Sequence, residues 1–595
     1  MQFLIFSLIA TTVLIFPSTT TQSETPPPLC SAADRAALLN FKAGISKDTT
    51  GILSTWTGAN CCSGGWEGVE CGAAAAGRVT TLILQNPSSG GGAAAGFMKG
   101  TLSPSLGNLR FLETMIITGM KRLAGKIPET LSNLTRLTHL VLDDNSLQGN
   151  IPSSLGHLVN IQTVSLSGNH LTGQIPESLG NLRYLNQLIL SKNFLSGPIP
   201  QTLIALKSLQ FLDLSYNSFS GPIPDFFGHF PNLTSLVLTK NRFSGQIPVS
   251  LFGLVRVSEL SIDQNQLTGK IPVQIGNLKS VSVLRLSSNK LSGQIPESIA
   301  HLPSLWNLNL SRNSLTNPFP EAAFGIGLRS LLSIDLSYNS LDLGAVPSWI
   351  KNRELSDVHL AGCKLRGALP NFTKPESLTT LDLSGNFFTS GVSSFLEHMS
   401  NLQSAKISNN LLNDDVSSIR LPDQISTLDL HSNRLSGSLT SVLSGRKIKF
   451  MEAVDISNNL ISGEIPGFGI GLNLRVLNFG NNKITGQIPS SISNLAKLER
   501  FDVSRNGLTG TIPTGLGLLS KLQWLDLSIN KLGGKIPASL LGIEALRHAS
   551  FRANRLCGEI PQGRPFNVFP KVAYAHNLCL CGKPLPPCKG RNMGQ

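Results

Sequence analysis

The chain has 595 residues and a formal net charge of +14, because 49 lysine and arginine side chains outnumber 35 aspartate and glutamate side chains. Charged residues are only 14% of the composition, and they form no lysine- or arginine-rich cluster of the kind that binds nucleic acid. We therefore expect no nucleic-acid partner, whereas acidic proteins or acidic polymers would suit the excess of positive charge. A chain of this length ordinarily forms several domains, but an internal repeat replaces that expectation with one extended array.

Residues 1–23 are predicted to be a secretory signal peptide. An apolar run of about 14 residues ends near Phe16, and small and polar residues follow as far as Ser23. The run is shorter than the roughly 20 residues of a membrane-spanning helix, although it lacks the basic start that is typical of signal peptides. No later stretch has the length of apolar sequence that a membrane span requires, so we expect a secreted mature protein without a transmembrane segment.

Residues 24–78 are predicted to form a cysteine-rich cap at the start of the array. The stretch from Cys30 to Lys42 is predicted to be a helix, with Leu38, Leu39 and Phe41 as its apolar contribution. An array of stacked units exposes an apolar cross-section at each end, and a cap stapled by disulfides would cover it. The cysteines of this segment are Cys30, Cys61, Cys62 and Cys71.

Residues 79–556 contain an asparagine that returns at an almost constant step. From Asn145 to Asn313 the step is 24 residues, and it stays between 23 and 26 as far as Asn554. A period in this range indicates one small structural unit stacked many times. The series is Asn145, Asn169, Asn193, Asn217, Asn241, Asn265, Asn289, Asn313, Asn339, Cys363, Asn386, Asn410, Asn433, Asn459, Asn482, Asn506, Asn530 and Asn554.

The residues before each asparagine are predicted to form a short strand. Leu212 and Leu214 lie two residues apart, so a strand would direct both side chains inward, and Asn217 follows where the strand ends. An amide side chain donates and accepts hydrogen bonds, so stacked asparagines can satisfy the turns as a ladder. We therefore expect an α/β solenoid, a curved rod of about 20 coils with a parallel β-sheet on its concave face.

The repeat resembles the plant extracellular class of leucine-rich repeat. Its motif is Leu-x-x-Leu-x-Leu-x-x-Asn-x-Leu-x-Gly-x-Ile-Pro. The Gly-x-Ile-Pro half decays between residues 314 and 450, where we expect the rod to bend or bulge. Cys363 occupies a ladder position, which this family accepts, so we expect a buried, unpaired and inert thiol. Good copies of the motif start at Leu137, Leu185, Leu209, Leu233 and Leu522.

Residues 557–595 are predicted to form a second cysteine-rich cap. Even numbers of cysteines at both ends favour disulfides over a metal site, for which Cys579, Cys581 and Cys588 would be the ligands, and the sequence alone leaves the pairing open. Both caps resemble those of plant receptor ectodomains and polygalacturonase inhibitors. That resemblance implies the disulfides Cys30–Cys61, Cys62–Cys71, Cys557–Cys579 and Cys581–Cys588.

No catalytic constellation is recognisable in the sequence. The ten histidines are scattered, and none has a serine or cysteine nucleophile in a recognisable elbow. Two pairs of adjacent carboxylates occur, Asp143–Asp144 and Asp414–Asp415, but neither is placed to face one sugar as a glycosidase requires, so we read both as solvated. We therefore expect a protein that is not an enzyme and that needs neither a cofactor nor a metal.

The exposed positions of the predicted concave sheet are the candidate ligand-binding surface. They lie one, four, six and seven residues before each ladder position. Lysine, arginine, tyrosine and tryptophan gather there between the coils of Asn193 and Asn339, and such side chains are common in binding hot spots, although ordinary solvated sheet residues are the alternative. The patch comprises Lys192, Tyr216, Lys240, Arg285, Trp306, Arg312 and Tyr338.

Two further sets of residues fall on or near this face. A column of aspartates has a structural interpretation, because Leu-Asp-Leu-Ser is common in this repeat class; its members are Asp382, Asp429, Asp455, Asp502 and Asp526.

A glycan on the concave face would obstruct part of the basic patch, and one of the N-glycosylation acceptors, Asn309, falls there. The four acceptors are Asn133, Asn232, Asn309 and Asn371.

We expect a secreted recognition protein of the plant cell wall or extracellular space that binds a protein ligand on its concave face. The chain resembles polygalacturonase inhibitors and related secreted proteins named for DNA-damage repair and toleration, so inhibition of pectin-degrading enzymes in defence is one expected role. Those proteins have far fewer coils, so their binding residues are not carried over. The alternatives are a receptor-like ectodomain that binds a peptide or steroid and acts with a membrane receptor kinase, and binding of acidic pectin by the basic face.

Overall fold

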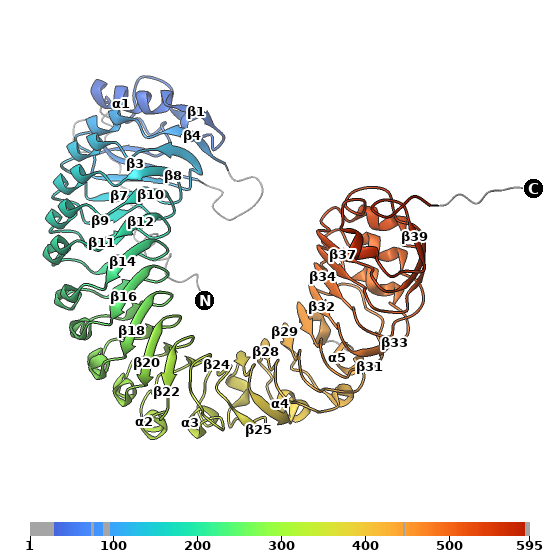
Figure 1. Cartoon of the computed structure of the whole chain (residues 1–595). Coiled ribbons are helices and arrows are strands. Elements are labelled where there is room, and N and C mark those ends of the chain that lie inside the picture. Colours follow the sequence, from blue (N-terminus) through green and yellow to red (C-terminus); the bar gives the residue numbers. More distant parts are fainter. Residues whose placement is uncertain (1–28, 73–76, 87–95, 444–446, 589–595) are drawn as a thin grey trace, which may run out of the picture. The chain divides into compact units, whose positions relative to one another are not determined.

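The chain consists of two compact units, Met1–His170 and Leu171–Gln595. Each is built from short coils that contribute one strand to a main parallel sheet and, in most coils, one strand to a second sheet (Figure 1). Among the described residues, no helix is long and apolar enough to cross a membrane. The predicted signal peptide at residues 1–23 lies outside the described residues. The computed structural model describes residues 29–72, 77–86, 96–443 and 447–588.

A cap covers the first edge of the main sheet in the first unit. Strand β2 (Val69–Cys71) pairs antiparallel with β3 (Val79–Gln85), which begins the sheet. Helix α1 (Ala32–Ala43) carries Asp34, a fully buried carboxylate that accepts two hydrogen bonds of 2.9 Å from Arg78. A buried charge needs a partner of this kind, so the ion pair fixes α1 against the start of the sheet.

The rest of the first unit consists of three coils. Its main-sheet strands pair in parallel, whereas in the second sheet β1 and β4 are antiparallel. The main-sheet strands after β3 are β5 (Thr114–Thr118), β7 (His139–Val141) and β9 (Thr163–Ser165). The second sheet holds β1 (Ile45–Asp48), β4 (Met98–Thr101), β6 (Arg122–Gly125) and β8 (Ser146–Asn150). Short 3₁₀ helices are η2 (Ile52–Thr55), η4 (Pro104–Asn108), η5 (Glu129–Asn133) and η6 (Ser153–His157).

The main sheet of the second unit is parallel throughout and in register, so equivalent residues of successive coils lie side by side. This parallel sheet confirms the predicted solenoid. Its strands are β11 (Gln187–Ile189), β13 (Phe211–Asp213), β15 (Ser235–Val237), β17 (Glu259–Ser261), β19 (Val283–Arg285), β21 (Asn307–Asn309), β23 (Ser333–Asp335), β24 (Asp357–His359), β26 (Thr380–Asp382), β28 (Ser404–Lys406), β29 (Thr427–Asp429), β30 (Ala453–Asp455), β32 (Val476–Asn478), β34 (Arg500–Asp502), β35 (Trp524–Asp526) and β37 (His548–Ser550).

The second sheet of this unit is regular only in the first coils. There it comprises β10 (His170–Gly173), β12 (Phe194–Gly197), β14 (Ser218–Pro222), β16 (Arg242–Gln246), β18 (Gln266–Lys270), β20 (Lys290–Gln294) and β22 (Ser314–Thr316). Among the described residues, later coils contribute two separate pairs, β25 (Arg366–Ala368) with β27 (Phe387–Ser390) and β31 (Ser462–Glu464) with β33 (Lys483–Thr485). The last group is β36 (Gly533–Gly534), β38 (Arg555–Glu559) and β39 (Cys579–Cys581).

Short helices close the coils on the side away from the main strands. Most are 3₁₀ turns that follow the proline of Ile-Pro, because proline fixes φ and cannot extend a strand ladder. These are η7 (Glu177–Asn181), η8 (Gln201–Ala205), η9 (Asp225–His229), η10 (Val249–Gly253), η11 (Val273–Asn277), η12 (Glu297–His301), η16 (Ser490–Asn494), η17 (Thr514–Leu518) and η18 (Ala538–Gly542). Where the motif decays, α2 (Glu321–Ile326), α3 (Ser348–Lys351), η13 (Pro375–Ser377), α4 (Val392–Glu397), η14 (Val416–Ser418), α5 (Thr440–Leu443) and η15 (Lys447–Phe450) replace them.

The asparagine ladder joins successive coils through hydrogen bonds to the backbone. At Asn289, Oδ1 accepts a hydrogen bond of 3.0 Å from the Leu267 amide of the preceding coil. Its Nδ2 donates to the Ile262 and Leu286 carbonyl oxygens, both at 3.1 Å. One amide thus satisfies backbone groups of two coils. Asn577 makes the same contacts in the C-terminal cap, so the ladder continues one position beyond the predicted series.

Cys363 takes a ladder position with a thiol, and it is buried and free as predicted. Its sulfur lies 3.7 Å from the Leu336 carbonyl oxygen and 3.8 Å from that of Ala361. In the next coil, Oδ1 of Asn386 accepts hydrogen bonds of 3.0 Å from the amides of both Cys363 and Leu365. Burial raises the pKa of the Cys363 thiol to about 12, which disfavours the reactive thiolate.

Aromatic side chains and two disulfides close the C-terminal end. The Phe551 ring lies 6.0 Å from that of Phe566 and 5.8 Å from that of Tyr574, measured between centroids. The Tyr574 hydroxyl, at the end of η19 (Lys571–Tyr574), donates a hydrogen bond of 2.8 Å to the Phe566 carbonyl oxygen. These rings cover the apolar end of the last coil. The disulfides are Cys557–Cys579 and Cys581–Cys588, the pairs that the resemblance implies.

Candidate functional site

Two surfaces of the second unit carry the predicted binding residues. Main-sheet strands such as β21 bury the central side chain and leave the first and third residues only half-buried, and we call the surface made by these residues the strand face. The residues directly before and after each ladder asparagine form a neighbouring surface, which we call the turn ridge. Its members are Lys192, Phe194, Tyr216, Ser218, Lys240, Arg242, Gln264, Gln266, Ser288, Lys290, Arg312, Ser314, Tyr338 and Ser340.

The residue before each ladder asparagine has a left-handed backbone. φ is +54° at Lys192 and Tyr216, and between +53° and +56° at Lys240, Arg312 and Tyr338. Residues with a Cβ rarely adopt this conformation, whereas glycine adopts it freely and asparagine tolerates it. From the sequence, the residues at this position are predicted only to be exposed, and their backbone conformation is not predicted. A signal for the turn was present, because the equivalent positions include Gly168, Gly362, Gly385, Asn409, Asn458 and Asn481.

Hydrogen bonds from the next coil hold this left-handed turn in place. The Tyr216 amide donates to the Thr239 carbonyl oxygen at 2.9 Å. The Tyr216 carbonyl oxygen in turn accepts a hydrogen bond of 3.2 Å from the Asn193 amide of the preceding coil. Because the amide and the carbonyl of Tyr216 are both hydrogen-bonded, its side chain projects from a rigid backbone position. The contacts between adjacent coils therefore fix the geometry of the turn ridge.

The structure brings four of the seven predicted site residues together as two cation–aromatic pairs. Nζ of Lys240 lies 4.8 Å from the centroid of the Tyr216 ring, and Cζ of Arg312 lies 4.7 Å from that of Tyr338. Each pair joins adjacent coils, and the two tyrosines are 44% and 46% exposed. Such contacts at exposed sites contribute about 0.5–1 kcal/mol, enough to orient the cations without removing them from solvent.

Arg285 and Trp306 lie apart from these pairs. Nη1 of Arg285 forms an ion pair of 3.0 Å with Glu259 and lies 3.3 Å from Oγ of Ser261, so its charge is balanced within the strand face. Trp306 is half-buried just before β21. The predicted patch therefore separates into a turn ridge with exposed cations and a strand face whose arginine already has a carboxylate partner.

The aspartates of the column have a structural role, as the sequence predicts, because most of them bind the serine two residues later. Oδ1 of Asp382, Asp455 and Asp502 each accepts hydrogen bonds from the amide and the hydroxyl of the serine two residues later. These carboxylates close the strand ends. Asp429 instead binds Nδ1 of His431 at 2.6 Å, and this hydrogen bond raises the pKa of the imidazole.

A stacked group near the C-terminal end was not selected from the sequence. Arg500, Trp524 and His548 occupy the same register position on adjacent strands. Cζ of Arg500 lies 4.8 Å from the indole centroid, and the Trp524 and His548 rings stack at 3.6 Å. The signal was present in the column six residues before the ladder, where the sequence showed Trp524 as exposed but its neighbours Arg500 and His548 were not compared with it.

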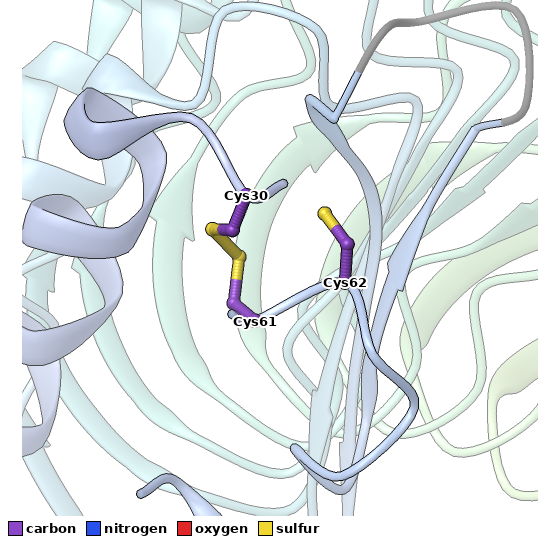
Figure 2. Close-up of side chains that lie close together, drawn as sticks. All are labelled: Cys30, Cys61 and Cys62. Atoms are coloured by element: carbon purple, nitrogen blue, oxygen red, sulfur yellow. A yellow bond between two sulfur atoms is a disulfide. The ribbon is translucent and has the colours of Figure 1, made fainter. Parts of the chain in front are cut away.

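Three cysteine sulfurs of the N-terminal cap lie within 4.8 Å of one another, as metal ligands would (Figure 2). Figure 2 shows the bond between Cys30 and Cys61, with Cys62 beside it. Cys62 is itself bonded to Cys71, so both pairs are those that the resemblance implies. Sulfur atoms in disulfides are not thiolates, and thiolates are what a zinc or iron site requires.

The two pairs of adjacent carboxylates, Asp143–Asp144 and Asp414–Asp415, are less solvated than the sequence predicts. Oδ1 of Asp143 accepts hydrogen bonds from the Ser165 hydroxyl and the Ser167 amide, at 2.7 and 2.8 Å. Asp414 accepts one of 2.8 Å from the Gly391 amide, and its other carboxylate oxygen is buried. The reading of both pairs as solvated was therefore wrong for the first member of each. Both bind backbone groups of a neighbouring coil, which the sequence does not reveal.

The four glycosylation acceptors differ in accessibility. Asn133 and Asn371 are exposed. Nδ2 of Asn232 donates a hydrogen bond of 3.2 Å to a backbone carbonyl, and Asn232 is half-buried. Asn309 lies on the strand face, where its Oδ1 accepts hydrogen bonds from the amide and the hydroxyl of Ser311 at 3.0 and 2.7 Å. Asn309 is thus an integral part of the sheet surface, whereas Asn133, at the end of η5, and Asn371 are exposed outside the main sheet.

Family models match several parts of the chain. The model described as leucine rich repeat N-terminal domain matches residues 31–72. One model described as leucine rich repeat matches residues 160–219 and 270–315. A second leucine rich repeat model matches residues 136–158, 232–254, 377–399, 473–495, 497–519 and 521–543.

Curated relatives match a limited part of the chain. It is 33% identical over 122 residues to the DNA damage-repair/toleration protein DRT100 of Arabidopsis thaliana, which is 20% of this chain and 32% of that protein. It is also 33% identical over 116 residues to polygalacturonase inhibitor 2 of Arabidopsis thaliana, which is 19% of this chain and 31% of that protein. The matched stretch thus spans about a third of these relatives.

Solved structures match over a much greater length. The ectodomain of the Arabidopsis thaliana membrane receptor kinase GASSHO1/SCHENGEN3, in complex with CASPARIAN STRIP INTEGRITY FACTOR 2, has a TM-score of 0.72 at 32% identity. That match covers 89% of this chain and 65% of the ectodomain. The ectodomain of the Arabidopsis receptor kinase HAESA, in complex with an IDA peptide hormone ligand, has a TM-score of 0.62 at 29% identity. That match covers 94% of this chain and 99% of the HAESA ectodomain.

Proposed function

Because the chain carries a leucine-rich repeat N-terminal domain followed by leucine-rich repeats, we propose that it is an extracellular, non-catalytic recognition protein that binds a peptide ligand on the exposed surface of its main sheet. The observation that carries this proposal is the match of 94% of the chain to an ectodomain solved with a peptide hormone. The match to polygalacturonase inhibitor 2 covers only 19% of the chain. Peptide recognition therefore comes before enzyme inhibition, the reverse of the order that the sequence favours.

The strand face and turn ridge offer what a peptide site requires. Extended peptides gain affinity from a rigid surface, because little ordering of the protein is needed on binding. The ladder supplies that rigidity at Tyr216 and its equivalents. Tyrosine and arginine, both present on the turn ridge, are also among the side chains that most often supply binding energy.

Four disulfides support the extracellular location, because such bonds persist in oxidising compartments. The plant cell wall or the outer surface of the plasma membrane would be that compartment, as the relatives suggest. Mass spectrometry of the protein recovered from extracellular fluid, with the sequence before residue 24 removed, would support this location. Retention inside the cell would contradict it.

The test is a binding screen with two matched variants. Secreted plant peptides are screened against the purified protein by thermal shift, and those that bind are titrated by calorimetry. Val237→Arg places a long cation on the strand face, at the register position that Arg285 holds two coils later. Val249→Arg places the same side chain on η10, away from that face.

We expect Val237→Arg to weaken binding at least about tenfold and Val249→Arg to leave it unchanged. A tenfold loss corresponds to about 1.4 kcal/mol, which is what one misplaced charged side chain in an interface readily costs. The opposite pattern, or the absence of any binding peptide, would overturn the proposal.

The second candidate function is inhibition of polygalacturonase-type enzymes. It is favoured by the 33% identity over 116 residues to polygalacturonase inhibitor 2 and by the disulfide-bonded caps. A panel of fungal and plant polygalacturonases would be assayed with and without the purified protein. Inhibition lost in Val237→Arg but kept in Val249→Arg would establish this function, and uninhibited enzymes across the panel would remove it.

A further inference from the structure

In the coils from Asn193 to Asn339, the turn ridge differs from the strand face in the state of its charges. It carries five cations, and no acidic residue occupies a ridge position. Within the described residues, none of these cations lies within 4.0 Å of a carboxylate, whereas Arg285, Arg475 and Arg500 on or beside the strand face are all paired. The cations are Lys192, Lys240, Arg242, Lys290 and Arg312.

We propose that the turn ridge is a separate subsite that binds an extended acidic segment of a peptide. This proposal rests on the proposed function, peptide recognition, and adds the chemistry and register of the ligand. Unpaired cations on a rigid surface attract carboxylates without first breaking internal ion pairs. The balanced Arg285–Glu259 pair would have to lose its partner to do the same.

The two cation–aromatic pairs set the spacing of the ligand charges. Lys240 and Arg312 are three coils apart, and neighbouring strands are about 4.8 Å apart, so the two cations are separated by roughly 14 Å. An extended peptide rises about 3.3 Å per residue, so residues four apart span nearly the same distance and point to the same side. The expected ligand therefore has acidic residues at positions i and i+4.

The residues between the two pairs refine this register. Gln264, Gln266 and Ser288 are uncharged, and only Lys290 adds a cation in these coils. A segment with uncharged residues between its two acidic residues fits this arrangement, whereas a polymer with a charge on every unit would place carboxylates opposite the glutamines. The tyrosine rings beside the cations add apolar surface, which suits peptide side chains better than a highly hydroxylated sugar.

The experiment uses short peptides of defined charge and the purified protein. A fluorescein-labelled peptide of glycine, serine and threonine carries glutamate at i and i+4, and two control peptides carry glutamine at both positions or glutamate at i and i+1. Binding is followed by fluorescence anisotropy. Lys240→Gln/Arg312→Gln removes the two ridge cations, and Lys207→Gln/Lys279→Gln removes two lysines that instead contact backbone carbonyls of His229 and His301.

We expect the i, i+4 glutamate peptide to bind at least about tenfold more tightly than either control peptide. The ridge double variant should abolish this preference and the control double variant should retain it. Tyr216→Leu/Tyr338→Leu keeps both cations and should weaken binding severalfold, because the rings no longer orient them. Circular dichroism of each variant would exclude loss of fold as the cause.

Three results would overturn the inference. Equal losses in the two charge-removing double variants would mean that net charge alone attracts the peptide. Equal affinity for the i, i+1 peptide would remove the proposed register. Competition by polygalacturonate at the same concentration of carboxylate would indicate a polymer site. Even after one of these results, a peptide whose binding is weakened by Val237→Arg but not by the ridge double variant would still support the proposed function.

Discussion

The coils from Leu171 to Asn313 and those from Ser314 to Phe450 share one main sheet but differ in their second sheet and in their short helices. The first group has a regular second sheet and 3₁₀ turns. In the second group that sheet ends with β22 and then shrinks to β25 with β27 and single bridges such as Asp415 to Ser436, and α2 to α5 appear. The main strands stay in register through both groups. The ladder and the main sheet therefore stay constant beneath the proposed binding surface, whereas the back of each coil varies.

The irregular coils also show what replaces the lost Gly-x-Ile-Pro motif. Where the regular motif would place it, the chain reads Asn317-Pro318-Phe319-Pro320, and the rings of Phe319, Phe324 and Trp349 pack together with centroids 5.2 to 6.4 Å apart. Arg353 donates hydrogen bonds to carbonyl oxygens at the end of α2, including those of Leu328 at 2.6 Å and Gly327 at 2.9 Å. In these coils a side chain thus satisfies the carbonyl oxygens at the end of a helix.

The largest expected effect concerns the ladder position at the centre of the irregular coils. The Cys363 thiol has a pKa of about 12, against roughly 8.5 for an unperturbed thiol, so its thiolate is scarce at pH 8. We expect alkylation by iodoacetamide at least about 1000-fold slower than for the unfolded chain. Mass spectrometry of native and urea-treated protein measures this, and fast labelling of native protein would contradict the buried position.

The next effect compares ladder asparagines from the two groups. Asn386 accepts two amides, those of Cys363 and Leu365, whereas Asn289 accepts one. Each buried group left unpaired costs about 1–3 kcal/mol, so we expect Asn386→Ala to lower the free energy of unfolding by about 3 kcal/mol and Asn289→Ala by about 2. Urea denaturation followed by tryptophan fluorescence checks the order. Equal costs would mean that Asn386 does not compensate for Cys363.

A third change tests whether the Arg353 side chain stabilises the irregular coils. Arg353→Gln removes the hydrogen bonds to the end of α2, and burial already lowers the pKa of this guanidinium. We expect a loss of about 2 kcal/mol in the free energy of unfolding, because buried carbonyls lose their donors. Arg329→Gln, at the equivalent but exposed position of the preceding coil, is the matched control and should cost less than about 0.5 kcal/mol.

The smallest effect concerns pH and the pair in β29 and its turn. The hydrogen bond with Asp429 raises the pKa of His431 above its ordinary value of 6.5. This contribution to stability is therefore complete below about pH 6.5 and is lost as the pH rises through the higher folded-state pKa. His431 is 31% exposed, so we expect a change of at most about 1 kcal/mol. Thermal unfolding from pH 5 to pH 9 should show it in the wild type and not in His431→Gln.

The repeat allowed most of the fold to be predicted. A fixed step places the strand, the asparagine and the buried leucines of every coil, and it identified Cys363 as a ladder position because the step continues through it. Asn577 was missed although it follows Asn554 by 23 residues, because it falls among the cysteines of the cap. The disulfide pairing followed from the resemblance of the caps, since spacing alone leaves it open.

The candidate site was less predictable, because it depends on contacts between coils. The step places Lys240 next to Tyr216 and Arg312 next to Tyr338, but whether cation and ring meet depends on side-chain rotamers. Arg285 and Glu259 come from different columns and meet diagonally across adjacent strands, so reading one column at a time did not pair them. The left-handed turn was visible only as scattered glycines.

The central claim is that ligand recognition belongs to the regular coils, on the strand face and turn ridge between Asn193 and Asn339. Hydrogen–deuterium exchange with a peptide obtained from the binding screen tests it most directly. We expect added protection in the main strands and turns of coils from Gln187 to Tyr338, with none in the helices behind them. Protection confined to the irregular coils after Asn339, or to the 3₁₀ side of the regular coils, would contradict it.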